Sequence, residues 1–209
     1  MINYPDSIRV YDNFLPEETA QKAYAQLSSL PQQWFSLRKT QFDPTSQKLK
    51  SVRTWWSIHG HKSENARLDA SGETTYQYMA TDNHQTGCDC LYCDLVKIFQ
   101  NNPPPEATGE KLLESYLSVY HPGDFHSQHT LEKTNSSWAF IYNLTTGWRP
   151  EWGGVINIEH PQGGWYAFPP VFNQLIVLDL SETQIVKTYT SMVNHESPVN
   201  RIAMHGWYT

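Results

Sequence analysis

Four side chains of the kind that bind zinc are crowded into ten residues of this chain. They are His84, Cys88, Cys90 and Cys93. Imidazole and thiolate are the ligands of small structural zinc sites, so the cluster predicts such a site. The alternative is that Cys90 and Cys93 begin a helix as half-buried thiols. We favour this alternative, because the spacing of the four residues is unusual for zinc.

A second set of residues is distributed in five blocks over the C-terminal half of the sequence. The first block begins at Tyr120 and ends at Leu131, and it reads Tyr-His-Pro-Gly-Asp-Phe-His-Ser-Gln-His-Thr-Leu. It is similar to the segment Tyr-x-Pro-Gly-Asp-Phe-x-x-x-His-Thr-Asp of the iron(II)- and 2-oxoglutarate-dependent oxygenase superfamily, nearest its prolyl 4-hydroxylase-like branch. The later blocks resemble that family in the same order, at residues 142–145, 148–154, 172–175 and 201–207. One block alone is weak, but five in order are specific.

The resemblance implies an iron site with substituted ligands. Relatives hold iron(II) with two histidines and one carboxylate, and they leave the remaining positions to 2-oxoglutarate and oxygen. His129 fills the first position, but Leu131 stands where the Asp is expected, on the same side of a strand. Counting along the resemblance places Gln184 at the position of the distal histidine. His195 is the alternative to it.

The same resemblance implies that the co-substrate end of the site is kept. Arg201 matches the basic residue that forms a bidentate salt bridge with the distal carboxylate of 2-oxoglutarate. Tyr120 matches a tyrosine that hydrogen-bonds the same molecule. The resemblance therefore implies that the residues that bind the 2-oxoglutarate carboxylate are kept, while two of the three iron ligands are substituted.

Two further neighbours of His129 carry metal-binding side chains. Glu132 would replace the missing carboxylate only if a β-bulge turned it inward. His126 lies three residues before His129, so in a regular strand it points to the opposite face. We therefore expect His126 at the rim of the site.

Because the co-substrate residues are kept and two metal-ligand positions are substituted, three functions remain open. The sequence does not assign catalytic residues. The first is a divergent iron(II) dioxygenase that hydroxylates a peptide or a small molecule. The second is a non-catalytic module that binds a carboxylate or a peptide in the same pocket. The third is a structural or assembly protein that reuses the shell alone.

The elements that must position these residues follow from apolar periodicity. A strand over 8–11 precedes a helix in which Pro16 takes the first helical position and which ends at Leu30. Residues 34–57 predict irregular strands, residues 59–87 a polar loop, and residues 91–101 a second helix. Short strands follow at 112–120, 136–144, 153–159, 165–168, 174–180, 184–191 and 200–208.

This order predicts one mainly β domain over residues 1–209. Residues 112–209 form a double-stranded β-helix, or jelly roll, and residues 1–111 supply helical and irregular support. The two helices pack outside the larger sheet.

Composition limits the partners of the protein. The net charge of −6 and the pI near 5.8 provide no basic field for a phosphate backbone, so we expect no nucleic-acid partner. The sequence shows neither a signal peptide nor an apolar run of the roughly 18–20 residues that span a membrane. We expect a soluble, cytoplasmic protein with a peptide or small-molecule partner.

Overall fold

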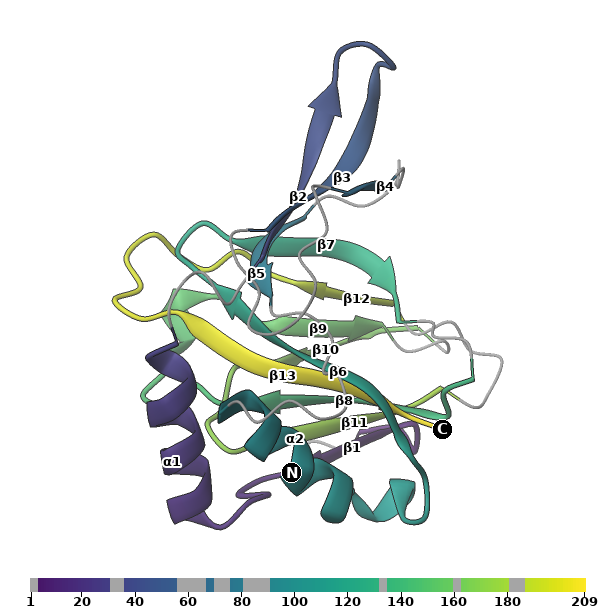
Figure 1. The fold of residues 1–209 in the computed structure, drawn as a ribbon, viewed down its shortest axis with the longest axis vertical. Helices are drawn as coiled ribbons and strands as arrows, with labels where there is room; N and C mark the ends of the chain where they lie inside the picture. The colour runs from purple at the N-terminus through teal and green to yellow at the C-terminus, as the bar shows by residue number, and fades with distance from the viewer. Residues whose placement is uncertain are drawn as a thin grey trace.

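The computed structural model describes residues 4–30, 36–55, 67–69, 76–80, 91–131, 135–159, 163–180 and 187–209 (Figure 1). Strands dominate this part of the chain, which confirms the mainly β prediction. The elements are β1 (Ile8–Tyr11), α1 (Glu17–Ser28), β2 (Ser36–Asp43), β3 (Lys48–Trp55), β4 (Arg67–Asp69), β5 (Tyr76–Ala80), α2 (Leu91–Asn101), η2 (Pro105–Ala107), β6 (Leu112–Tyr120), β7 (Phe125–Thr130), β8 (Trp138–Asn143), η3 (Pro150–Trp152), β9 (Ile156–Glu159), β10 (Trp165–Phe168), β11 (Leu175–Asp179), β12 (Lys187–Thr190) and β13 (Arg201–Tyr208).

Ten of the thirteen described strands form one antiparallel hydrogen-bonded path that folds into two layers, and β2, β3 and β4 extend from β5 beside it. Its order is β1-β11-β8-β13-β6-β5-β7-β12-β9-β10. The larger layer contains β1, β11, β8, β13 and β6, and the smaller one contains β7, β12, β9 and β10. β5 joins them, because Ala80 pairs with Ser118 of β6 while Tyr76 pairs with His126 of β7.

An inner apolar cluster fills the space between the two layers. It contains Ile8, Ala139, Ile141, Ile156, Ile158, Phe168, Ile176, Leu178, Ala203 and Trp207. These residues come from both layers, so the cluster is the interior of the jelly roll. An inward-facing polar side chain therefore sits in a largely apolar, dry environment.

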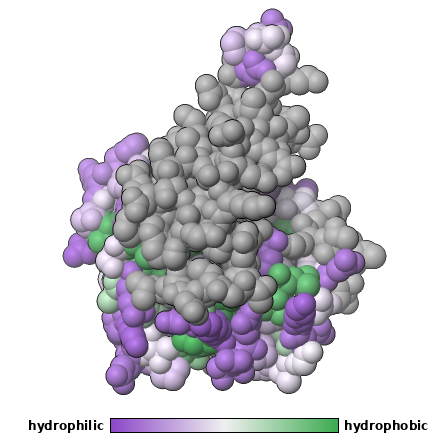
Figure 2. All heavy atoms as spheres, in the orientation of Figure 1, coloured by the Kyte–Doolittle hydropathy of each residue, from purple (hydrophilic) through white to green (hydrophobic). Residues whose placement is uncertain are grey.

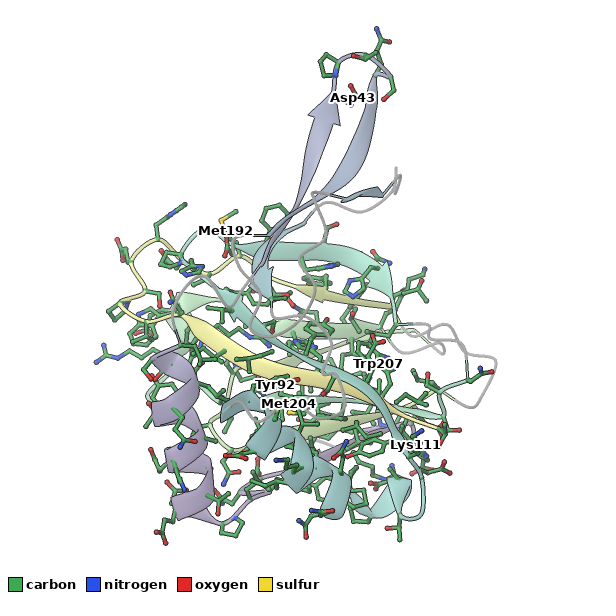
Figure 3. All side chains as sticks on the ribbon, viewed as in Figure 1. Asp43, Tyr92, Lys111, Met192, Met204 and Trp207 are labelled. Atoms are coloured by element: carbon green, nitrogen blue, oxygen red, sulfur yellow. The ribbon has the colours of Figure 1, made fainter. Side chains whose placement is uncertain are left out.

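The helices cover the other face of the larger layer. Ala20, Ala23 and Leu27 of α1 pack with α2 and with the outward residues of β13, such as Met204. Figure 3 shows Met204 beside Tyr92 of α2, and both belong to this outer cluster. Alternation along β13 thus sends Met204 towards the helices and its neighbour Ala203 inward.

Both predicted helices are confirmed, with one correction at the start of α1. Pro16 has φ −51° and ψ 135° and precedes the helix, so it is the N-cap residue rather than the first helical residue. In the described part of the chain, neither helix is long and apolar enough to cross a lipid bilayer.

The region between the helices is more regular than the sequence predicts. Residues 36–55 form an eight-by-eight-residue hairpin instead of irregular strands, and β4 and β5 lie within the predicted loop over 59–87. The hairpin projects from the body (Figure 1). Its tip is hydrophilic (Figure 2), and there Asp43 accepts hydrogen bonds from the Thr45 backbone N–H and the Ser46 hydroxyl. β7 is absent from the predicted strand ranges.

Candidate carboxylate site and metal site

Arg201 lies at the start of β13 and is completely buried, with 0% of its surface exposed. Its Nε, Nη1 and Nη2 atoms have no hydrogen-bond partner among the residues that the structure describes. Burial lowers the pKa of the guanidinium, but this group keeps its proton in proteins. The site therefore holds a positive charge that no described residue neutralises.

Aromatic and glycine residues shape the space around this guanidinium. Its carbon lies 5.1 Å from the centre of the Tyr120 ring, which is the cross-strand neighbour of Arg201. Gly154 has φ +62°, and a Cβ there would lie 3.0 Å from Arg201 Cδ and 3.1 Å from Trp148 Cζ2. The structure thus brings together Arg201 and Tyr120, the two residues predicted for the co-substrate.

Asn143 is a further polar residue on the same inner wall, and the sequence reasoning did not assign it. It is completely buried, and within the described part of the chain neither its Oδ1 nor its Nδ2 has a hydrogen-bond partner. It pairs with Ala203, which is one step along β13 from Arg201 on the inner face. The sequence does contain a signal for this residue: Asn143 ends the otherwise apolar strand β8, and a buried polar side chain needs a hydrogen-bond partner.

His129 lies on β7 and faces the interior. It pairs with Thr188, which in turn pairs with Ile158 of the inner cluster, and cross-strand partners project to one face. Its Nδ1 lies 3.1 Å from the Ser127 carbonyl oxygen, and its Nε2 lies 3.3 Å from the Thr188 hydroxyl. Burial lowers the pKa of His129, which favours the neutral imidazole that binds metals. Leu131 packs against the inner cluster and supplies no ligand.

The expectation that His126 points to the opposite face of the strand from His129 is wrong. The two ring centroids are 3.8 Å apart. The cause is a register shift: His126 pairs with Thr190 and His129 with Thr188, so three steps on β7 match two on β12. The resulting bulge returns position i+3 to the side that position i occupies.

The remaining predicted metal ligands do not complete an iron site in the described residues. His195 is exposed in the loop after β12, where its Cε1 lies 2.8 Å from the place of a Cβ on Gly123. Gln184 and Glu132 lie outside the described residues. Among the residues that the structure describes, no three His, Cys, Asp or Glu side chains lie close enough to hold one ion. The iron triad of the family is therefore not matched there.

Zinc at the cysteine cluster finds no support either. Cys93 is 1% exposed and belongs to the apolar cluster under α2. His84, Cys88 and Cys90 lie outside the described residues. The placement of Cys93 agrees with the alternative, in which it is a buried thiol of the helix.

Comparison with known proteins identifies the lineage of this site. The family model of the 2OG-Fe(II) oxygenase superfamily matches residues 115–209. Residues 115–209 belong to this superfamily. The matched segment contains the whole inner wall described above, including Arg201, Asn143, His126 and His129. No curated protein matches the chain.

Solved structures of oxygenases share the fold. A Pseudomonas putida prolyl-4-hydroxylase has a TM-score of 0.63 at 14% identity, over 97% of this chain and 91% of that chain. A Trichoplax adhaerens prolyl hydroxylase, in complex with a hypoxia inducible factor peptide fragment, has a TM-score of 0.59 at 13% identity, over 97% and 83%. A Burkholderia pseudomallei oxidoreductase of the 2OG-Fe(II) oxygenase family has 0.57 at 12%, over 97% and 85%. These similarities confirm the predicted jelly roll.

Proposed function

We propose that this 2OG-Fe(II) oxygenase-like protein binds a dicarboxylate of the 2-oxoglutarate class inside its jelly roll. The observation that carries the proposal is the completely buried Arg201, whose guanidinium nitrogens have no hydrogen-bond partner among the described residues. Leaving such a cation unpaired costs several kcal/mol, of order 3–5 when one partner of a buried pair is missing. A carboxylate matches the guanidinium fork in charge and in geometry.

The other residues of the wall fit a ligand with a second polar end. Asn143 lies diagonally across the strand pair from Arg201 and has an unused donor and an unused acceptor. Tyr120 covers the guanidinium with its ring. We assign the first carboxylate to Arg201 and a polar group further along the ligand to Asn143.

A second candidate function is oxidation of a peptide or a small molecule, as the lineage implies. The inward-facing His129 favours it, because the family resemblance assigns this imidazole to the first iron-ligand position, and iron with 2-oxoglutarate would supply the oxidant. The described residues do not provide the carboxylate and the distal histidine of the triad. The first candidate, binding of a dicarboxylate at Arg201, therefore needs no catalysis. It corresponds to a carboxylate- or peptide-binding module.

Thermal unfolding with and without ligand tests the proposal. The full chain is heated with 2-oxoglutarate, with succinate, and with butyrate as a monocarboxylate control. A ligand that binds only the folded state at 100 times its Kd stabilises it by about 2.7 kcal/mol. We expect this for the dicarboxylates and a smaller effect for butyrate.

Two variants decide whether Arg201 is responsible. Arg201→Met should abolish the stabilisation by ligand and leave the free protein equally or more stable, because it removes an unpaired buried charge. The matched control is Arg149→Met, since the Arg149 side chain is 68% exposed and salt-bridged to Glu151. Unchanged ligand stabilisation in Arg201→Met, or none in the unmodified protein, would refute the proposal and leave a structural or assembly role.

A further inference from the structure

We propose that His126 and His129 form a two-imidazole site for a divalent transition-metal ion on the inner face of β7. In this site His126 supplies the ligand that Leu131 cannot. The site is independent of the carboxylate proposed at Arg201, and it goes beyond the ligand set that the family resemblance implies. It takes an ion of the zinc, cobalt, nickel and iron(II) class.

The bulge in β7 is the feature that builds the site. Ser127 and Gln128 lie between the two histidines, and only Tyr189 lies between their partners Thr188 and Thr190 on β12. The imidazole rings therefore stand on one side of the strand, with centroids 3.8 Å apart and planes at 50°. Bulges of this kind redirect side chains beside active sites.

One backbone carbonyl orients both rings. Nδ1 of His126 lies 2.9 Å and Nδ1 of His129 lies 3.1 Å from the Ser127 oxygen. A carbonyl oxygen only accepts hydrogen bonds, so each Nδ1 carries the proton. In a neutral ring the lone pair then lies on Nε2. Metal-binding histidines almost always donate their other N–H to such an acceptor.

The surroundings of the pair select the class of ion. His129 Nε2 lies 3.3 Å from the Thr188 hydroxyl, a long contact that a metal ion would replace. Thr188 and Thr190 are buried, at 4% and 7% exposure, so the strand behind the rings is dry. Two neutral nitrogen donors suit borderline metals and not magnesium or calcium, and open positions remain for water or an anion.

Titration of the tag-free full chain with Co²⁺ and Zn²⁺, after removal of metal by chelator and without any carboxylate, tests this site. Visible absorption of Co²⁺ and calorimetry report stoichiometry and affinity. We expect one ion per chain, and at least about tenfold weaker binding in His126→Gln and in His129→Gln. His121→Gln is the matched control, since the His121 side chain is 42% exposed and pairs with Asp124, and it should bind as the unmodified protein does.

Proton NMR of the Co²⁺ form provides a second readout that does not depend on the variants. The two Nδ1–H protons held by Ser127 should give two strongly shifted resonances. Unchanged affinity in His126→Gln, a single shifted resonance, or no binding by the unmodified protein would overturn the site. Arg201→Met should keep the metal affinity, so failure here is distinguishable from failure of the carboxylate proposal.

Discussion

Asn173 is the residue that ties the wall of the site to the rest of the molecule. It is completely buried at φ +59°, its Oδ1 accepts from the Leu15 N–H at 3.0 Å and the Tyr142 hydroxyl at 2.8 Å, and its Nδ2 donates to the Leu15 carbonyl at 2.8 Å. Its own N–H donates to the carbonyl of Asn143. One side chain thus joins the start of α1 to the strand that carries Asn143.

The first prediction concerns this node. Asn173→Ala should lower the free energy of unfolding by about 2–4 kcal/mol, because it leaves buried hydrogen-bonding groups without a partner and replaces asparagine, which tolerates positive φ, by alanine, which does not. Tyr142→Phe, which removes one bond of the set, should cost about 1 kcal/mol. Urea denaturation measures both. A smaller loss in Asn173→Ala than in Tyr142→Phe would contradict this account.

The second prediction concerns Leu131, which stands at the position where the family resemblance expects the Asp ligand. Leu131→Asp should strengthen Co²⁺ binding by at least about tenfold, since position 131 and His129 share one face of the strand. It should also destabilise the metal-free protein, because Leu131 packs against the inner cluster. Leu131→Asn is the control of equal size. Equal metal affinity in the two variants would show that position 131 does not reach the ion.

At the scale of elements, β13 contributes to the site because one of its faces lines the interior of the jelly roll and the other packs against the helices. Arg201 and Ala203 face the interior, while Ile202 and Met204 belong to the outer cluster under the helices. Gly206 continues this outer face opposite Phe140 of β8. The absence of a side chain at Gly206 lets the Phe140 ring lie against β13.

The third prediction follows from that contact. Gly206→Ala should destabilise the protein by about 1–3 kcal/mol, because its Cβ would lie 2.3 Å from Phe140 Cε1. Phe140 cannot retreat, since it stacks on Phe99 at 4.8 Å. Phe140→Leu in the same chain should recover part of the loss, and a double-mutant cycle by urea denaturation measures the coupling. Purely additive losses would contradict the steric explanation.

At the scale of the whole molecule, the N-terminal half completes the sheet that the oxygenase segment begins. β1 pairs with β11 from Ile8 to Tyr11, and β5 bridges β6 and β7. α1 and α2 cover the outer cluster. The family match begins only at residue 115, so it includes neither β1 and β5 nor the two helices.

The fourth prediction is that residues 112–209 do not fold alone. Without residues 1–111 the larger layer loses its edge strand, and its outer face exposes an apolar surface. We expect an aggregating fragment without a cooperative thermal transition, as measured by circular dichroism, beside a full chain that unfolds in one step. Cooperative unfolding of the fragment would argue against the prediction that residues 1–209 are a single domain.

Much of the element order was predictable because it depends on local signals. The strand at 8–11, the helix at 91–101 and the strand at 112–120 have the predicted bounds, since apolar periodicity and turn residues act over short ranges. β5 was not predictable, because it lies in a polar stretch and owes its pairing to β6 and β7. The regular hairpin β2–β3 likewise forms through pairing between its two strands.

The sequence by itself determined the resemblance to the oxygenase superfamily and the kinds of side chain in the candidate site: a guanidinium that suits a carboxylate, an imidazole that suits a metal, and leucine where relatives have a carboxylate. Only the tertiary structure decided how these groups act together. Whether Arg201 is paired depends on every element packed around it, and here none of the described residues neutralises it. The side of β7 that His126 occupies depends on the register with β12, which is a long-range property. Cross-strand pairing, which no local pattern encodes, therefore placed the second imidazole beside the first.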